Sequence, residues 1–190
     1  MGEKTALYIH FPWCVRKCPY CDFNSHENEG ELPEKAYIAA LIADLESDLA
    51  SNNFSISQAE IGSIFMGGGT PSLFSPGAIN QLLEGIRSRL DLTPDVEITM
   101  EVNPGSISSH KTSTAINDTV ISRTGRSELL GKNKLAGFYA AGVNRLSIGI
   151  QSLNRTHLVS LGRIHDPDSA IATYRHARSV GFRNINIDIM

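Results

Sequence analysis

Three cysteines lie within a short stretch near the start of the chain. They are Cys14, Cys18 and Cys21, in the pattern CxxxCxxC, and the 190-residue sequence contains no other cysteine. An odd number of thiols cannot pair off within one chain, and a cluster this tight would close only very short loops. Thiolates are ligands for soft metals and for iron–sulfur clusters. The spacing therefore predicts a metal role in a reducing compartment, which we expect to be the cytoplasm.

The number of thiols favours one kind of metal centre. Three thiolates can hold three irons of a [4Fe–4S] cluster, and without a fourth cysteine one iron would be open to another ligand. The alternative is a structural zinc site, which needs four ligands and usually has CxxC pairs. His10 or His26 could complete such a site. We favour the cluster and keep the zinc module as an alternative.

A second set of polar residues falls where strands of a sheet are expected to end. Gly67, Gly68, Gly69 and Thr70 follow one apolar run, and Arg163 lies in the loop sequence LGRIH. The residues at or after the ends of later runs are Glu101, Gln151 and Asp188. In parallel α/β barrels the functional groups gather at the carboxyl ends of the strands. The pattern predicts one shared site, in which Arg163 could clamp a carboxylate.

Five β-rich runs alternate with amphipathic helical segments along the chain. The runs cover residues 6–11, 61–66, 96–102, 143–150 and 184–189. Helices are expected over 33–49, from Ser75 and Pro76 onward, up to Gly142, and from Asp166 to Gly181, the last with Ile171, Tyr174 and Ala177 inward. This alternation predicts βαβ units and a parallel sheet. Several runs are almost continuously apolar, which is typical of strands covered on both faces.

One segment interrupts this alternation. Residues 110–133 are rich in Ser, Thr and Asn and show no clear helical period. A structureless loop of this length is unusual inside a compact domain. We expect a flexible insertion within a single, incomplete core domain that spans residues 1–190.

The composition excludes two classes of partner. Basic residues number 17 against 20 acidic ones, for a formal net charge of −3. This balance provides no basic excess for binding a phosphate backbone, so we expect no nucleic acid partner. No apolar run is long enough to span a bilayer, so we expect no membrane span.

The cysteine loop, the strand before it and Tyr20 just before Cys21 together resemble the radical S-adenosylmethionine superfamily. The sequence GGGTP is similar to the glycine-rich motif with which that family holds the methionyl amino group, although Thr70 stands where many members have Glu. The resemblance implies that S-adenosylmethionine chelates the open iron through its amino and carboxylate groups. It also implies that the cluster passes an electron to the sulfonium, which generates a 5′-deoxyadenosyl radical.

Further motifs resemble the oxygen-independent coproporphyrinogen III oxidase group. They are YIHFPWCVRKCPYCDF, MGGGTPS, EVNPGS, RLSIGIQS, LGRIHD and NINIDIM. The resemblance implies an α/β fold, namely a partial (β/α)6 barrel truncated before its last strand and its C-terminal domain. It also implies that the S-adenosylmethionine site is formed by Tyr8, Tyr20, Gly68, Gly69, Thr70, Glu101, Gln151, Arg163 and Asp188.

Within this group, two subgroups differ near the cysteines. The oxidases carry a further cysteine two residues after the third, where this chain has Phe23, and they have a long extension before the motif. Both differences make the chain similar to the HemW-type heme chaperones. Similarity to that subgroup implies that the protein binds heme, respiratory heme-acceptor proteins and an electron donor. The oxidase, which decarboxylates a porphyrinogen, remains the alternative. The candidate heme ligands are His10, His26, His157, His165 and His176.

Overall fold

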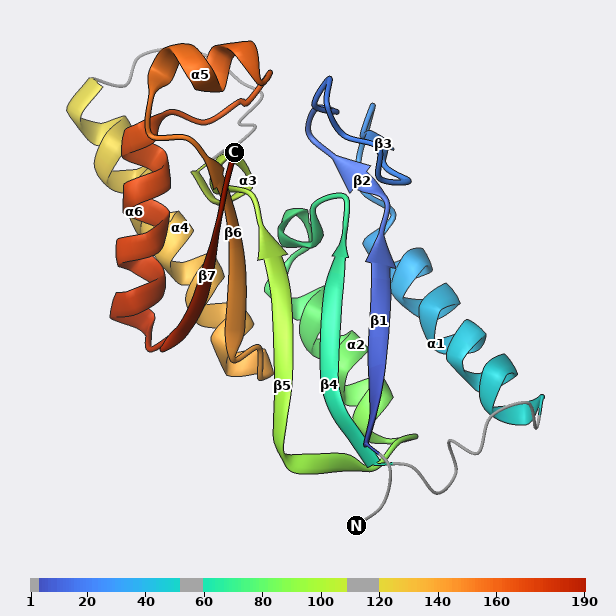
Figure 1. Cartoon of the computed structure of the whole chain (residues 1–190). Coiled ribbons are helices and arrows are strands. Elements are labelled where there is room, and N and C mark those ends of the chain that lie inside the picture. Colours follow the sequence, from blue (N-terminus) through green and yellow to red (C-terminus); the bar gives the residue numbers. More distant parts are fainter. Residues whose placement is uncertain (1–3, 52–59, 109–119) are drawn as a thin grey trace.

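Five parallel strands form one sheet in the computed structural model, which describes residues 4–51, 60–108 and 120–190. The strand order is β1-β4-β5-β6-β7, so the strands lie side by side in the order in which they occur in the sequence (Figure 1). The strands are β1 (Lys4–Phe11), β4 (Glu60–Gly68), β5 (Leu92–Val102), β6 (Arg145–Gln151) and β7 (Asn184–Ile189). The predicted α/β fold with five parallel strands is confirmed.

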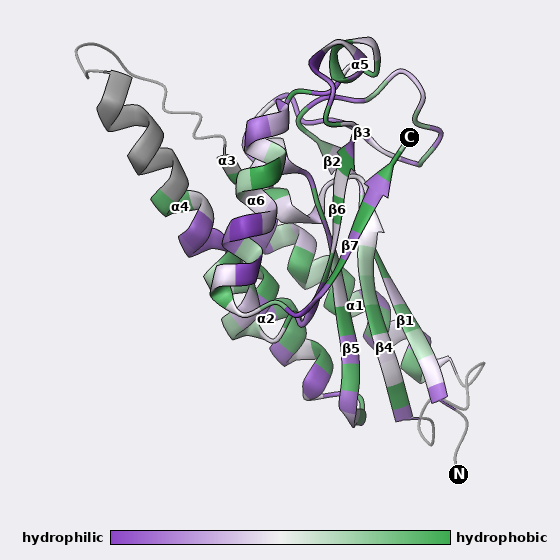
Figure 2. Ribbon diagram, turned by 60° about the vertical axis from the view of Figure 1, so that its left-hand side comes forward, coloured by the Kyte–Doolittle hydropathy of each residue, from purple (hydrophilic) through white to green (hydrophobic). Residues whose placement is uncertain are grey.

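The long helices connect successive strands and lie on one face of the sheet. They are α1 (Glu34–Ala50), α2 (Pro76–Arg87), α4 (Val120–Ala141) and α6 (Pro167–Val180). Crossovers between parallel strands are right-handed, so a sheet whose strands follow in chain order receives all its helices on the same side. Figures 1 and 2 show this arrangement. We call the opposite face, which none of the described helices covers, the helix-free face.

Short elements gather at the carboxyl ends of the strands. The two-residue strands β2 (Trp13–Cys14) and β3 (His26–Glu27) pair with each other above β1 (Figure 1). The others are the 3₁₀ turn η2 (Pro71–Leu73) and the short helices α3 (Pro104–Ser108) and α5 (Arg155–Ser160). None of these short elements was predicted from the sequence.

Local signals in the sequence set the ends of two helices. The Ser75 side chain accepts a hydrogen bond from the backbone N–H of Ala78 at the start of α2. The Asp166 carboxylate does the same for the N–H of Ser169 at the start of α6, which ends at Gly181 with a φ of 126°. Both caps and the glycine stop agree with the predicted boundaries.

Helix α4 begins earlier than the sequence indicates. It runs from Val120, so residues 120–133 of the segment predicted to be a flexible insertion are helical, while residues 109–119 lie outside the described residues. Its last turns carry the buried Leu135, Phe138 and Ala141. Once this packed end has formed, adding further helical residues is easier than starting a new helix. A stretch with little hydrophobic periodicity of its own can therefore extend α4.

The sheet has one apolar face and one polar face. Side chains toward the helices, such as Ile64, Met66 and Met100, are at most 1% exposed. On the helix-free face, Ser147 donates to the Asp188 carboxylate at 3.1 Å, and Asn186 donates to Ser147 at 3.0 Å. The expectation that the strands are covered on both faces is wrong for the described residues, because the helices cover only one face.

The inward face of α6 also differs from the prediction. The buried residues are Ala170, Thr173 and Ala177, whereas Tyr174 is 37% exposed. Small side chains on this face let α6 approach α4 and the sheet closely. Strand β7 pairs only with β6 among the described strands, so it forms an edge of the described sheet. No described helix is both long and apolar enough to cross a membrane.

Candidate cofactor site

The cysteines lie on a loop that we call the cluster loop, residues 12–25, which continues from the end of β1. The glycine-rich end of β4 holds the start of this loop. The N–H of Gly69 donates to the carbonyl of Phe11 at 2.6 Å, and the N–H of Thr70 donates to that of Trp13 at 2.7 Å. A Cβ at Gly69 would stand 2.7 Å from both carbonyl oxygens, so only glycine allows this close approach.

Aromatic side chains support the loop from the side of the core. The Trp13 ring meets Tyr37 of α1 edge-on, with centroids 4.6 Å apart, and Phe11 meets Phe74 at 4.9 Å. The Tyr37 hydroxyl donates to the backbone carbonyl of His10 at 2.6 Å. Edge-to-face aromatic pairs add stability beyond the area they bury. The first turn of the loop is therefore packed against the core.

A lysine closes the loop. The Lys17 ammonium donates to the backbone carbonyls of Phe23 at 3.1 Å and Ser25 at 2.8 Å. The backbone N–H of Lys17 donates to the Glu27 carboxylate at 2.9 Å. These bonds bring the residues after Cys21 back beside those that follow Cys14, so the segment that carries the three cysteines forms a closed loop.

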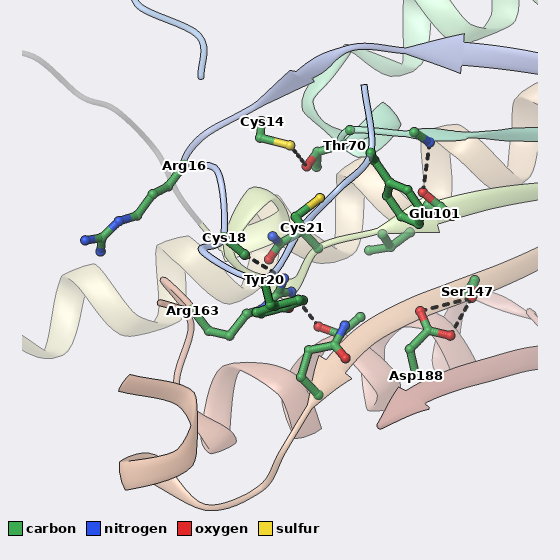
Figure 3. A pocket seen from close by; sticks show the side chains of 17 residues that line it. Cys14, Arg16, Cys18, Tyr20, Cys21, Thr70, Glu101, Ser147, Arg163 and Asp188 are labelled. Atoms are coloured by element: carbon green, nitrogen blue, oxygen red, sulfur yellow. Dashed lines mark hydrogen bonds between the residues drawn. The ribbon is translucent and has the colours of Figure 1, made fainter. Parts of the chain in front are cut away.

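One pocket joins the cluster loop to the strand ends (Figure 3). The predicted site residues that line it are Cys14, Cys18, Tyr20, Cys21, Gly68, Gly69, Thr70, Glu101, Gln151, Arg163 and Asp188. They come from the cluster loop, from the ends of β4, β5, β6 and β7, and from the loop between α5 and α6. These residues therefore surround one pocket at the carboxyl ends of the strands.

Tyr8 is the predicted site residue that does not line the pocket. It lies on the helix-free face of β1, 56% exposed, where its ring stacks with Phe65. Its hydroxyl is 3.0 Å from Nδ1 of His10. The His10 ring lies against Gly68, where an added Cβ would approach within 2.4 Å of it. Tyr8 therefore reaches the pocket wall through His10.

Several residues that line the pocket were not predicted from the sequence. They are Arg16, Phe23, Val102, Asn103, Ser147 and Gly149. Ser147 and Gly149 precede Gln151 by four and two residues on β6. Because side chains two apart in a strand point the same way, this alternation could have identified them.

The three thiols suit an iron–sulfur cluster. All are free and half-buried, and their side chains line the same pocket. Thiolates on one short loop are the usual protein ligands of such clusters. In the described part of the chain, no three His, Cys, Asp or Glu side chains are arranged to hold a single metal ion.

Glu101 supplies a partly buried carboxylate to the pocket. The N–H of Gly68 donates to it at 3.1 Å. Burial raises the pKa of this carboxyl above its ordinary value, and the nearby Asp188 raises it further, whereas the Gly68 hydrogen bond and His10 oppose the shift. Among the described residues, the Glu101 carboxylate forms no salt bridge. It could therefore attract a cation that enters the pocket.

Arg163 lies between the cluster loop and β6 (Figure 3). Its guanidinium donates to the carbonyl of Gly149 at 2.7 Å and to the sulfur of Cys18 at 3.5 Å. Tyr20 lies beside it, and burial raises the pKa of its phenol while the Arg163 charge opposes that rise. The site therefore contains acidic, basic and thiol groups within one pocket.

Comparison with known proteins identifies the family. The model of the radical SAM superfamily matches residues 8–190. The chain belongs to the radical SAM superfamily. Membership implies S-adenosylmethionine and an iron–sulfur cluster as cofactors, which agrees with the thiols and polar groups of the pocket.

Radical SAM proteins named as heme chaperones are among its relatives. The chain is 43% identical to "Heme chaperone HemW" of Escherichia coli and 41% identical to that of Haemophilus influenzae, in each case over 97% of this chain and 42% of the relative. It is 35% identical to "Radical S-adenosyl methionine domain-containing protein 1, mitochondrial" of Bos taurus, over 100% of this chain and 36% of the relative. The chain thus spans about two fifths of the length of these proteins.

A solved radical SAM structure shares the fold. The coproporphyrinogen III oxidase HemN of Escherichia coli superimposes with a TM-score of 0.76 at 24% sequence identity, over 99% of this chain and 37% of that one. This likeness supports the fold as part of a radical SAM barrel.

Proposed function

We propose that this chain is the cofactor-binding part of a HemW-like heme chaperone. The observation that carries the proposal is the single pocket in which three free thiols meet the polar strand ends. The names of the relatives at 41–43% identity supply heme as the cargo. We also propose that residues 1–190 form a radical SAM core within which 110–133 is an insertion, which the Ser-, Thr- and Asn-rich sequence of that segment supports.

The cluster loop would hold the metal centre. Cys14, Cys18 and Cys21 would each bind one iron of a [4Fe–4S] cluster, which leaves the fourth iron to S-adenosylmethionine. When bound, such a cluster supplies the electron that cleaves the sulfonium of S-adenosylmethionine. The loop itself positions the three sulfurs and, through Trp13 and Lys17, resists their separation.

The strand ends would bind S-adenosylmethionine. Gly68, Gly69 and Thr70 line the place of its methionyl end, and Glu101 offers a carboxylate to the cationic amino group. The Arg163 guanidinium suits the methionyl carboxylate. The other contacts with polar groups of the cofactor are assigned to Gln151, Asp188, Tyr20 and, at the edge of the site, Tyr8.

Phe23 favours the chaperone over the oxidase. It lines the pocket with 58% of its surface exposed, at the position where the oxidase motif carries a further cysteine. A phenyl ring can neither ligate iron nor exchange protons or electrons with a porphyrinogen. We therefore propose heme transfer to respiratory acceptor proteins, with an electron donor to the cluster, in the reducing environment of the cytoplasm, where free thiols persist.

Three of the five candidate heme ligands already make ring hydrogen bonds within the fold. The ring nitrogens of His10 contact the Tyr8 hydroxyl and the Asn24 carbonyl, and Nε2 of the buried His165 lies 3.1 Å from the Ile150 carbonyl. Nδ1 of His157 lies 3.4 Å from the Ser152 hydroxyl, so His26 and His176 are the candidates whose rings make no hydrogen bond among the described residues.

Three measurements on the anaerobically reconstituted protein test the proposal. Iron and sulfide analysis should find four of each per chain, and zinc without iron would refute the cluster. Heme titration, followed by the Soret band, should show stoichiometric binding. Turnover of coproporphyrinogen III with S-adenosylmethionine and a reductant would instead establish the oxidase.

A further inference from the structure

Each of the three cysteine sulfurs faces a hydrogen-bond donor. The Thr70 hydroxyl is 3.6 Å from Sγ of Cys14, and the Arg163 guanidinium is 3.5 Å from Sγ of Cys18. The hydroxyl of Ser25 is 3.8 Å from Sγ of Cys21. These distances lie in the range of hydrogen bonds to sulfur. A thiolate has no proton to give, so in the cluster-bound state the hydroxyl must donate in both hydroxyl–sulfur pairs.

The three donors come from different segments of the chain. Thr70 follows β4, Ser25 ends the cluster loop, and Arg163 lies between α5 and α6. The sulfurs are therefore surrounded by donor groups that the tertiary fold brings together. Figure 3 shows the Cys14–Thr70 pair and the position of Arg163 beside the cluster loop.

Further contacts hold each donor in place. The N–H of Thr70 donates to the Trp13 carbonyl at 2.7 Å, and the N–H of Ser25 donates to the Phe23 carbonyl at 2.7 Å. Thr70 is 5% exposed and Ser25 is 6% exposed. Arg163 is held by its bond to the Gly149 carbonyl. The three donors therefore need little rearrangement to reach the sulfurs.

From this arrangement we infer that Thr70, Arg163 and Ser25 set the reduction potential of the cluster by donating to its thiolates. Reduction adds one electron, taken from a one-electron donor, and increases the negative charge on the sulfurs. Donors at the sulfurs stabilise that charge and so raise the potential. Arg163 acts most strongly because its hydrogen bond carries a full positive charge. The inference rests on the proposed cluster and extends it to what surrounds the ligands.

The test is a redox titration of the reconstituted protein without S-adenosylmethionine, followed by the EPR signal of the reduced cluster. Thr70→Val removes the hydroxyl but keeps the shape, and Thr70→Ser retains the donor. At the midpoint potential of the unmodified protein, we expect Thr70→Val to lower the ratio of reduced to oxidised cluster about tenfold, a shift of about 59 mV for one electron. Thr70→Ser should restore the original midpoint.

Two further variants and a control complete the series. Ser25→Ala should shift the potential in the same direction, and Arg163→Met should shift it furthest, with Arg163→Lys in between. The control, Thr156→Val, replaces a threonine by valine as in Thr70→Val, but at an exposed position of α5. It should leave the midpoint potential of the cluster unchanged.

Iron and sulfide content is measured first for every variant, so that potentials are compared only between loaded samples. If Arg163→Met does not load, the two hydroxyl variants decide the matter. Full cluster content with unchanged midpoints in Thr70→Val and Ser25→Ala would overturn the inference. Failure of the unmodified protein to form any cluster would instead refute the proposed function.

Discussion

Gly162 packs directly against Pro19 of the cluster loop. A Cβ at Gly162 would stand 2.8 Å from Cδ of the proline ring, and the backbone there has a φ of 68°. The next residue, Arg163, contacts Cys18. The loop between α5 and α6 therefore touches the cluster loop at two adjacent positions, and this contact joins the late part of the chain to the cysteines.

Gly162→Ala should disturb this contact. The methyl group would clash with Pro19, and the left-handed backbone disfavours any side chain, so we expect a loss of about 1–2 kcal/mol in unfolding free energy. The iron content after reconstitution should fall as Cys18 is displaced. Urea denaturation and iron analysis measure both effects. Gly30→Ala is the matched control, because nothing lies within 4 Å of its added Cβ. Equal iron content in the two variants would contradict the expectation.

Cys14→Ala should abolish cluster assembly. Two remaining thiolates leave half of a four-iron cluster without protein ligands, so the brown absorbance and the bound sulfide should be absent. Chemical iron and sulfide analysis after anaerobic reconstitution is the measurement. Cys18→Ala and Cys21→Ala should behave alike. A loaded Cys14→Ala protein with full iron and sulfide would refute this ligand assignment.

Glu101→Gln should weaken S-adenosylmethionine binding about tenfold, because an amide lacks the charge that attracts the amino group. In the unmodified protein, binding should also weaken as the pH falls through the pKa of Glu101. Since burial raises that pKa, the loss should begin at a higher pH than for an ordinary glutamate. Equilibrium dialysis against pH measures both effects.

The control for this prediction lies on the same strand. Glu97→Gln changes a carboxylate four residues earlier on β5, which pairs with Arg145 and does not line the pocket. It should leave the affinity unchanged. Identical pH profiles for Glu101→Gln and the unmodified protein would show that another group titrates.

Lys134→Met should stabilise the fold at neutral pH. Burial lowers the pKa of the Lys134 amine to about 8, although the nearby Glu34 opposes the shift. The unfolded chain has a lysine pKa of about 10.4, so it binds more protons than the folded chain between about pH 8 and 10.4, and stability rises with pH there. Below that window the charged amine costs roughly 3 kcal/mol.

Its hydrogen bond to the Leu73 carbonyl, at 3.2 Å, offsets part of this penalty. After about 1 kcal/mol is subtracted for that bond, Lys134→Met should gain about 2 kcal/mol at pH 7. The rise in stability between pH 8 and 10 should disappear. Urea denaturation at pH 7, 8, 9 and 10 measures this. Lys132→Met, at an exposed position of α4, is the control and should leave the profile unchanged.

Much of the fold could be predicted because its signals are local. Ser75 and Asp166 cap helices through bonds to residues three positions away, and the strands appear as short apolar runs. The start of α4 could not be predicted in this way. That helix is stabilised at its far end, where Leu135 and Phe138 pack into the core, so the sequence near Val120 carries little of the information.

For the site, the sequence by itself determined the ligand chemistry: three thiols at CxxxCxxC spacing and polar groups after successive strands. It did not determine which donor meets which sulfur. Arg163 and Cys18 are 145 residues apart, and only the ordered packing of the strands, with the α5–α6 loop against the cluster loop, brings them to 3.5 Å. The type and spacing of nearby residues decide which atoms can bind, whereas contacts between distant segments exist only after the sheet has formed. For the same reason the tertiary structure alone separated Tyr8 from the pocket.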